Sequence, residues 1–354
     1  MININRRKFI AAITQAGVGL AAAGIVSGFP VNNIKKLAPL LTGPGGNPIT
    51  TLAKWKVQRG IIKKRWLDYL GALTPNPVPP ILRVINEDRP EGLIRQLVEY
   101  EGEPGITVKG YLLRPQNIKE PLPGIVAMHS TSDGEMKYIS GVEQGHIVAF
   151  GYNLAKQGFV VFCPQCFLRW HENKSASALE EVAKFQKRHP GSKGMAKMLF
   201  DAQRAVDVLD SLEIVDSNRI GAMGHSLGAK EVFYLGAFDD RVKVIVSNEG
   251  GIGIDFSNWD APWYLGEGIH DFGHQHHEVL SLVAPKPFLL IGGGSADGEF
   301  SRPYIEAVKP VYGLYGKNQG TVKLLNHGKG HGVAPIAEEW TYKWMEKYLW
   351  LNGT

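Results

Sequence analysis

Five residues near the middle of the chain, Gly224 to Gly228, read G-H-S-L-G and place a serine between two glycines. They follow a short apolar run over 219–223 and precede a run of helical character over 229–237. This pattern is typical of a nucleophile elbow, a tight strand-to-helix turn that exposes the serine hydroxyl. Both glycines are needed because a side chain there would collide with the neighbouring strand or helix. We therefore predict that Ser226 is a nucleophile.

A serine hydroxyl needs a general base within hydrogen-bond reach and a carboxylate that orients the base. After a turn of this kind, the partners follow in the chain order serine, acid, base. Asp297 lies just after the apolar run 287–291, and His331 lies in a glycine-rich loop after the run 321–325. Both loops follow the carboxyl ends of expected strands, where an α/β sheet places its ligands. We therefore predict Asp297 as the acid and His331 as the base.

Three other residues compete for these roles. Glu249 follows the apolar run 242–247 and could reach the same histidine, so it is the alternative acid. Glu299 lies in the same loop as the predicted acid, where a solvated charge is the simpler interpretation. His327 lies four residues before the predicted base, and we expect it to support the loop.

The negative charge that develops on a tetrahedral intermediate needs hydrogen-bond donors aimed at it. The backbone N–H of Leu227, directly after the serine, is the first predicted donor. The second comes from the loop after an early strand, where we predict the backbone N–H of Thr131, with Ser130 as the alternative. His129 in the same loop is a candidate for the substrate pocket, although support of the loop is the simpler interpretation.

The segment 250–277 is a long irregular stretch rich in aromatic residues, histidine and glycine. Long irregular segments in compact domains are usually functional. Trp259, Trp263 and Trp170 could stack on a sugar ring, and buried packing explains them equally well. Neighbouring histidines and acids could be read as metal ligands, but their spacing matches no zinc pattern, so we expect a polar lid or pocket rim and no metal. These residues are His270, Asp271, His274, His276, His277 and Glu278.

Apolar runs and helical patterns alternate along most of the chain. Such alternation predicts an α/β fold with a mostly parallel sheet of about eight strands and helices on both faces. An antiparallel hairpin over 94–100 and 106–113 precedes it. Further expected strands span 124–128, 159–163, 219–223, 242–247, 287–291 and 321–325. Expected helices span 147–157, 179–188, 195–212, 229–237, 304–315 and 338–351.

Basic residues are concentrated at the start of the chain. Residues 1–67 hold eleven Lys and Arg and no Asp or Glu, which leaves 28 basic against 34 acidic residues in the remainder. A slightly acidic body without a basic stripe gives no sign of nucleic-acid binding. The pair Arg6-Arg7 precedes an apolar run over 10–26, the layout of a twin-arginine export signal. We expect an exported protein, periplasmic or extracellular, with an uncleaved N-terminal anchor as the alternative and no other membrane contact.

These features predict three parts of the chain. Residues 1–28 form the export signal, 29–93 a lead-in packed on the body, and 94–354 the catalytic domain. Cys163 and Cys166 form a C-x-x-C pattern, which suggests a redox site, but no clear helix start follows to lower a thiol pKa. We interpret them as packed thiols, with a local disulfide as the alternative.

With these residues in place, the chain resembles the α/β-hydrolases of the dienelactone-hydrolase-like and acetyl-xylan-esterase-like branch. The resemblance spans about residues 100–350 and rests on the elbow and on the stretches 215–221, 238–242, 284–290 and 330–331. It implies hydrolysis of carboxylic esters through an acyl-enzyme, without a cofactor.

Two departures from the family refine this expectation. Ser226 stands where dienelactone hydrolases carry a cysteine, and Leu227 stands where bacterial glucuronoyl esterases typically carry an arginine. Lys230 matches the lysine of the glucuronoyl esterase motif and is a further pocket candidate. We expect a serine esterase acting on a small-molecule or glycan ester, such as an acetylated carbohydrate. The alternatives are a glucuronoyl-type methylesterase, a serine peptidase of the same fold, and a non-catalytic binding protein of this fold.

Overall fold

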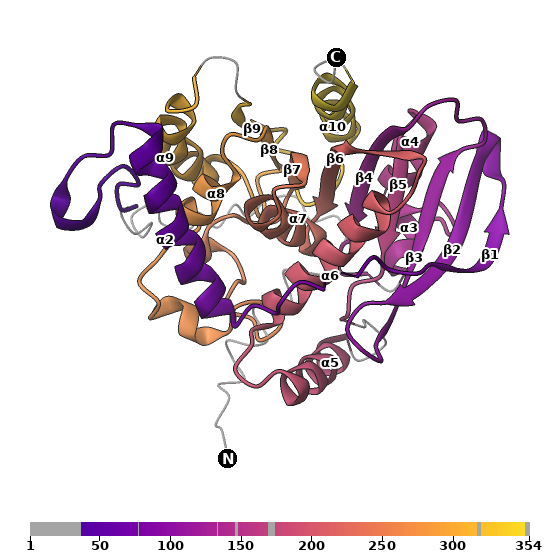
Figure 1. The fold of residues 1–354 in the computed structure, drawn as a ribbon, viewed down its shortest axis with the longest axis horizontal. Coiled ribbons are helices and arrows are strands. Elements are labelled where there is room, and N and C mark those ends of the chain that lie inside the picture. The colour runs from indigo at the N-terminus through magenta and orange to yellow at the C-terminus, as the bar shows by residue number, and fades with distance from the viewer. Residues whose placement is uncertain are drawn as a thin grey trace. The chain divides into compact units, whose positions relative to one another are not determined.

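A mostly parallel sheet of nine strands runs through the described part of the chain (Figure 1). The computed structural model describes residues 37–350, apart from 77, 133, 146–147, 169–173 and 317–319. The strand order is β1-β2-β3-β5-β4-β6-β7-β8-β9. The strands are β1 Arg83–Asp88, β2 Leu93–Glu101, β3 Thr107–Pro115, β4 Leu122–Met128, β5 Val160–Pro164, β6 Val215–His225, β7 Val242–Asn248, β8 Phe288–Gly292 and β9 Val322–Asn326.

Helices connect most of the parallel strands, as the alternation predicts. The α-helices are α2 Leu52–Leu70, α3 Glu135–Ile139, α4 Phe150–Lys156, α5 Lys174–Arg188, α6 Gly194–Asp210, α7 Leu227–Phe238, α8 His277–Val283, α9 Arg302–Gly313 and α10 Pro335–Met345. Short 3-10 turns span Pro44–Gly46, Pro90–Gly92, Ile254–Phe256, Glu267–His270 and Glu299–Ser301, and a π-helical turn, Glu346–Trp350, continues α10.

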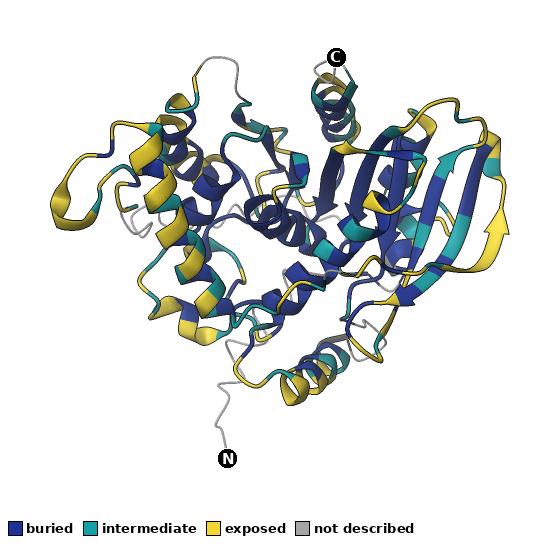
Figure 2. Ribbon diagram, viewed as in Figure 1, coloured by how far each residue is buried: buried dark blue, intermediate teal, exposed yellow. Residues whose placement is uncertain are grey.

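Neighbouring strands pair antiparallel from β1 through β2 and β3 to β5. The strands β5, β4, β6, β7, β8 and β9 pair parallel in that order across the sheet. The expected fold class is therefore confirmed, with one strand more than the sequence indicated. The additional strand, β1, lies at the edge of the sheet, and all six of its residues are exposed (Figure 2). Its residues show neither the continuous burial of the central strands nor the alternating burial of β3. It lies within the stretch expected as a lead-in, so this stretch contributes to the sheet.

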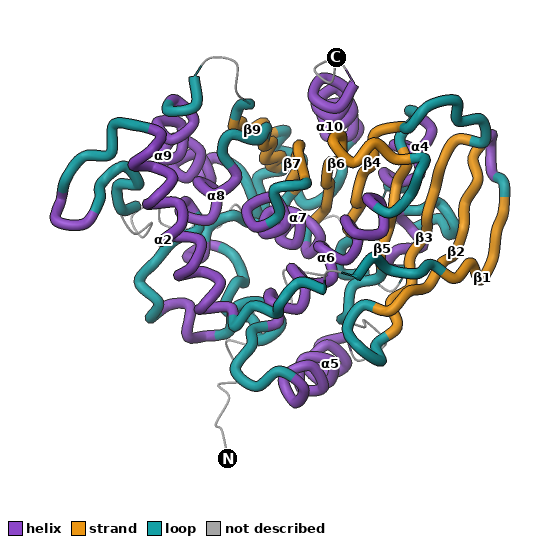
Figure 3. The backbone as a smooth tube through the Cα atoms, in the orientation of Figure 1, coloured by secondary structure: helices purple, strands orange, loops and turns teal. Residues whose placement is uncertain are grey.

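The two faces of the sheet carry separate hydrophobic cores because neighbouring residues of a strand point to opposite sides. Val126 and Phe162 belong to the cluster that includes α6 and α7, whereas Ile125 and Val161 belong to the cluster that includes α4 and α10. Figure 3 shows helices on both sides of the central strands. The strands between them are buried on both faces, so they read as continuous apolar runs.

Helix α2 was not expected from the sequence. It begins after Thr51, whose hydroxyl accepts a hydrogen bond from the Lys54 N–H at 3.3 Å, and it ends at Gly71 in the left-handed conformation. Such a cap and such a glycine are common helix ends. Trp55 and Trp66 are fully buried on one face of α2, which packs against α8. The tryptophans therefore dock part of the lead-in onto the body.

The structure also gives the state of the two cysteines and the length and polarity of the helices. Cys163 and Cys166 are buried and form no disulfide bond, and burial raises the pKa of both thiols. No helix among the described residues is long and apolar enough to cross a bilayer. The expected export signal and Trp170 lie outside the described residues.

Candidate active site

The turn between β6 and α7 has the geometry that the G-x-S-x-G pattern predicts. Ser226 adopts φ 57° and ψ −113°, a backbone conformation that residues other than glycine rarely adopt. A Cβ on Gly224 would lie 2.1 Å from the Gly228 carbonyl oxygen, and a Cβ on Gly228 would lie 2.2 Å from the Met128 carbonyl oxygen. Each glycine thus permits a backbone contact that a larger residue would prevent. The second contact brings the end of β4 directly against the elbow.

The structure brings the predicted base to the predicted nucleophile. His331 lies in the loop after β9, and its Nε2 is 2.9 Å from the Ser226 hydroxyl oxygen. About 40% of the His331 side chain is exposed, so the pair faces solvent. The ring of His225 packs 5.0 Å from the His331 ring, centre to centre. Asn248 lies within hydrogen-bond distance of both His225 and the Gly332 carbonyl.

Glu249, the alternative acid, completes the constellation. It directly follows β7, and its Oε2 lies 3.3 Å from His331 Nδ1. Its side chain is fully buried. Gly293 and Ala296 donate their backbone N–H groups to this carboxylate, the second at 2.8 Å, and the Ser295 hydroxyl donates at 2.6 Å. The carboxylate is therefore held by neutral donors and faces the imidazole.

Asp297 does not contact His331, which corrects the placement expected from the sequence. Its carboxylate accepts the N–H groups of Gly251 at 2.6 Å and Ile252 at 2.9 Å, and the Ser301 hydroxyl at 2.6 Å. The side chain is buried, and burial raises the pKa of its carboxyl group. Asp297 follows the expected strand, but its side chain turns toward the segment after β7.

The Glu249 and Asp297 side chains point in directions that depend on close backbone contacts, and no sequence motif indicates these contacts. Glu249 has a φ of 56°, so the chain turns sharply after β7 and aims this side chain toward the base. A Cβ on Gly293 would lie 1.8 Å from the Gly330 carbonyl oxygen, so the loops after β8 and β9 touch there.

Of the other candidates, Glu299 forms an exposed ion pair with Arg302. His327 accepts the Lys329 N–H within its own loop.

One predicted oxyanion donor, Leu227, adjoins the nucleophile along the backbone, and the other, Thr131, lies in the loop after β4. Leu227 is the first residue of α7, and the first N–H groups of a helix have no partner within the helix. Thr131 follows the end of β4, which contacts the elbow at Gly228. Their role as donors stays a prediction.

His129 holds the loop that carries Thr131. The Cys166 N–H donates to His129 Nε2 at 3.0 Å, so the ring carries its proton on Nδ1, which donates to the Ser130 carbonyl at 2.8 Å. The ring is buried. These contacts connect the loop after β4 to the loop after β5, in agreement with a supporting role.

The other pocket candidates, Trp259, Trp263 and Lys230, are buried. The Lys230 ammonium lies 3.9 Å from the centre of the Trp259 ring and donates to the Ser257 hydroxyl at 2.8 Å. Burial lowers the pKa of Lys230 to about 7. Trp259 and Trp263 both pack against Tyr264, whose ring centre lies 5.1 Å from the Lys230 ammonium, so packing explains their burial. A contact with substrate stays a prediction for all three.

The histidines of the irregular segment bind different partners. His276 donates to the Ile252 carbonyl at 2.8 Å and accepts from the Tyr234 hydroxyl at 2.9 Å. Burial lowers the pKa of His276 to about 3, which keeps the ring neutral. His274 lies beside Glu278 and His270 beside Asp260, and the described residues contain no group of three metal-ligating side chains.

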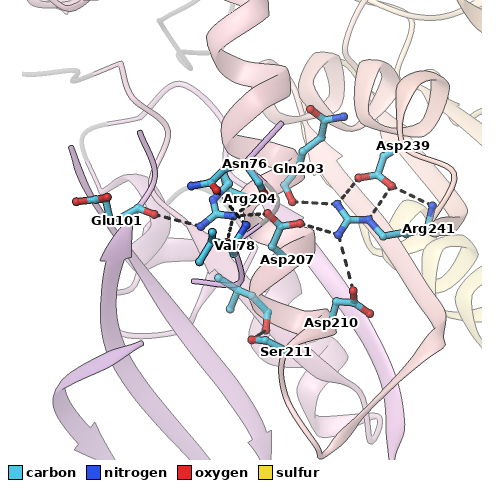
Figure 4. Close-up of polar contacts among 11 residues, drawn as sticks. Asn76, Val78, Glu101, Gln203, Arg204, Asp207, Asp210, Ser211, Asp239 and Arg241 are labelled. Carbon is cyan, nitrogen blue, oxygen red and sulfur yellow. Dashed lines mark hydrogen bonds and ion pairs between the residues drawn. The ribbon is translucent and has the colours of Figure 1, made fainter. Parts of the chain in front are cut away.

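A cavity of about 210 Å³ is lined in part by residues whose polar contacts Figure 4 shows. Arg241 binds Asp239 at 2.7 Å and Asp207 at 2.6 Å, and Asp207 also binds Arg204. Asp239 and Arg241 precede β7, so they lie at the amino ends of the parallel strands, whereas Ser226 lies at the carboxyl ends. Both arginines around this cavity are ion-paired with aspartates, and we assign the cavity no catalytic role. Its lining is Pro75, Asn76, Phe200, Gln203, Arg204, Asp207, Phe238, Asp239, Asp240 and Arg241.

The sheet and the elbow have the α/β-hydrolase fold, and comparison with known proteins agrees. Residues 108–260 match the model of the Dienelactone hydrolase family. This match includes the elbow and Glu249, and the resemblance inferred from the sequence is thereby confirmed. The chain is also 25% identical over 279 residues to YtaP, a candidate hydrolase of Bacillus subtilis (strain 168), covering 74% of this chain and 90% of YtaP.

Solved structures share the fold at low sequence identity. A glucuronoyl esterase from Solibacter usitatus has a TM-score of 0.71 at 17% identity, covering 90% of this chain and 98% of that one. A glucuronoyl esterase from Teredinibacter turnerae T7901 has a TM-score of 0.65 at 18% identity, covering 88% and 89%. A candidate acetyl xylan esterase from Bacteroides fragilis NCTC 9343 has a TM-score of 0.60 at 14% identity, covering 80% and 77%. These similarities establish the α/β-hydrolase fold.

The elbow generates a first prediction. Gly228→Ala places a methyl group against the Met128 carbonyl, so we expect it to lower the free energy of unfolding by several kcal/mol or to prevent folding. Gly60→Ala is the matched control, because nothing lies within 4 Å of that site on α2 and alanine favours a helix by about 0.5–1 kcal/mol. Urea unfolding of both variants checks this. Equal stability of the two variants would contradict the close contact.

The buried side chain of Glu231 leads to a second prediction. Burial raises the pKa of Glu231 from its ordinary 4.5 to about 8. Between these pH values the folded chain keeps a proton that the unfolded chain loses, so the free energy of unfolding falls as pH rises, by at most about 1.4 kcal/mol per pH unit. Glu231→Gln removes this dependence, so the stability of the variant relative to wild type rises from pH 5 to pH 8.

Urea unfolding at pH 5 and pH 8 measures this change. Glu299→Gln is the control because its carboxyl group is exposed and its pKa lies below 4.5, so it is ionised at both pH values. A stability difference between Glu231→Gln and wild type that stays constant from pH 5 to pH 8 would refute the raised pKa of Glu231.

Proposed function

We propose that the protein is a serine hydrolase of carboxylic esters, with Ser226 as nucleophile, His331 as base and Glu249 as acid. The observation that carries the proposal is the continuous contact from the Ser226 hydroxyl to His331 Nε2, at 2.9 Å, and from His331 Nδ1 to Glu249, at 3.3 Å. A serine hydrogen-bonded to an imidazole, itself oriented by a carboxylate, is the arrangement that activates a hydroxyl for acyl transfer.

The proposed reaction has two halves. His331 takes the proton of Ser226 as the oxygen attacks the ester carbonyl, and the backbone N–H groups of Leu227 and Thr131 stabilise the oxyanion. The protonated imidazole, stabilised by Glu249, then gives its proton to the departing alcohol and leaves an acyl-enzyme. A water molecule, deprotonated by His331, hydrolyses this ester and releases the acid.

The assignment of the acid distinguishes this mechanism from the one expected from the sequence. Glu249→Gln replaces the acceptor of the His331 Nδ1 proton and favours the wrong tautomer, so we expect kcat for p-nitrophenyl acetate to fall by about 10³–10⁴. Ser226→Ala and His331→Ala should lower it at least as much. Glu299→Gln, an exposed carboxylate in a neighbouring loop, should keep wild-type activity.

Two results would contradict this mechanism. Undiminished turnover by Ser226→Ala would exclude Ser226 as the nucleophile. Wild-type kcat in Glu249→Gln would exclude Glu249 as the acid and leave the base without an orienting carboxylate.

We further propose that the substrate is an ester of a carbohydrate and that the protein acts after export. Three features support this: the names of the structural neighbours, the solvent-facing Ser226–His331 pair, and the twin-arginine-like sequence at Arg6-Arg7. Within this class an acetyl ester is our first candidate. A methyl ester of glucuronic acid is the second, favoured by the TM-score of 0.71 and by Lys230, whereas Leu227 does not match that motif.

A substrate comparison separates these candidates. We expect purified protein to release acetate from acetylated xylan faster than methanol from methyl glucuronate, because the arginine of the glucuronoyl motif is absent at Leu227. Acetate and methanol release would be measured at equal protein concentration, with Ser226→Ala as the blank. Faster methanol release would favour the methylesterase.

A further inference from the structure

Two buried carboxylates lie on either side of the segment that follows β7, and the proposed reaction uses only one of them. Glu249 begins this segment and faces His331. Asp297 binds the backbone two and three residues further on, at Gly251 and Ile252. Although Asp297 stands where the sequence pattern expects the acid, it contacts neither Ser226 nor His331 in the structure. The contacts of Asp297 therefore indicate a role other than that of the catalytic acid.

The segment from Glu249 to Ile252 needs to be held in place. Glu249 has a φ of 56° and Gly251 a φ of 74°, so the backbone is left-handed twice within three residues. A left-handed conformation is strained for a non-glycine residue and persists only where its surroundings fix it. A Cβ on Gly250 would lie 2.9 Å from the Ala229 Cβ, so this turn also packs closely against α7.

Four hydrogen bonds satisfy the polar backbone groups of Gly251 and Ile252. The Asp297 carboxylate accepts both N–H groups, at 2.6 and 2.9 Å. The Trp259 indole donates to the Gly251 carbonyl at 2.6 Å, and His276 donates to the Ile252 carbonyl at 2.8 Å. Consecutive N–H groups form a concave site that suits an anion, and Asp297 supplies that anion from within the chain. No other contact among these four carries a formal charge.

The contacts between the two loops are reciprocal. The loop that contains Asp297 donates to the Glu249 carboxylate through Gly293, Ser295 and Ala296. The segment that begins with Glu249 donates to the Asp297 carboxylate in return. Each loop thus fixes the carboxylate of the other, and a shift of either loop moves Glu249 relative to His331.

We propose that Asp297 is a positioning residue, whose carboxylate holds the backbone after Glu249 so that the Glu249 carboxylate faces His331. This proposal rests on the proposed function, because it concerns the acid of that reaction. Asp297 touches no reacting atom, so its removal weakens the orientation of His331 and leaves substrate binding unchanged.

Asp297→Asn tests the proposal because it keeps the size of the side chain but turns an N–H₂ group toward one of the two backbone donors. A misplaced catalytic group costs on the order of 100-fold in rate, so we expect kcat for p-nitrophenyl acetate to fall by about 10- to 100-fold with KM within about threefold. In the Glu249→Gln background the same substitution should lower kcat by less than about threefold, because the group it positions is already lost. Asp240→Asn is the control, because it replaces an exposed carboxylate just before β7, at the amino ends of the parallel strands.

A second readout does not depend on turnover. The His331 Nδ1 proton gives a downfield resonance in protein labelled with ¹⁵N-histidine, and its hydrogen bond to Glu249 sets its position. We expect Asp297→Asn to shift or broaden this resonance, Glu249→Gln to abolish it, and Asp240→Asn to leave it unchanged. If Asp297→Asn does not fold, Ser301→Ala replaces it. That change removes one donor at 2.6 Å and keeps both backbone contacts, and it should lower kcat about two- to fivefold.

The outcomes separate the two proposals. An unchanged kcat and resonance in Asp297→Asn, or in Ser301→Ala where the first variant does not fold, would overturn the positioning role. An equal fall in kcat in the wild-type and Glu249→Gln backgrounds would overturn it too, because Asp297 would then act independently of Glu249. Wild-type activity in Glu249→Gln would instead refute the proposed triad, whereas an effect of Asp297→Asn on the resonance alone would support positioning in a protein whose ester is still to be found.

Discussion

The buried carboxylate of Glu249 is the interaction on which the arrangement of this site depends. A buried charge is stable only where hydrogen bonds replace the water it has lost. Here the donors come from the loop after β8 and the imidazole from the loop after β9. Satisfying this one group therefore draws together the ends of three neighbouring strands. The serine is added from a fourth, β6, through the elbow.

Backbone strain is concentrated at the same place. Glu91, Ser226 and Glu249 are the non-glycine residues with positive φ in the described part of the chain, and two of them belong to the proposed triad. Strained conformations persist where the surrounding structure fixes them, and they gather at functional sites. At Ser226 the surroundings are the glycine contacts of the elbow. At Glu249 they are the hydrogen bonds on either side of the following turn.

The sequence predicted the fold and two members of the proposed triad because both leave local signals. Strands buried on both faces read as apolar runs, and the elbow requires glycines at fixed spacing. The acid leaves no such signal. A sequence shows which residues follow a strand but not the direction in which a side chain turns, and that direction depends on a left-handed Glu249 and on the contact between Gly293 and Gly330. Strand β1 was missed because its residues are exposed and lack a buried alternation.

Helix α2 has a consequence for the order in which the chain acquires its structure. The Trp66 indole donates to Glu278 and the Trp55 indole to Tyr315, partners that lie 212 and 260 residues further along the chain. During synthesis α2 leaves the ribosome early, yet the surfaces that cover its tryptophans are made only after most of the chain is complete. Contacts at such separation carry a large loop-closure entropy and form late in folding. A helix made early is thus among the last to be fixed, and until then its two tryptophans lack the surfaces that cover them.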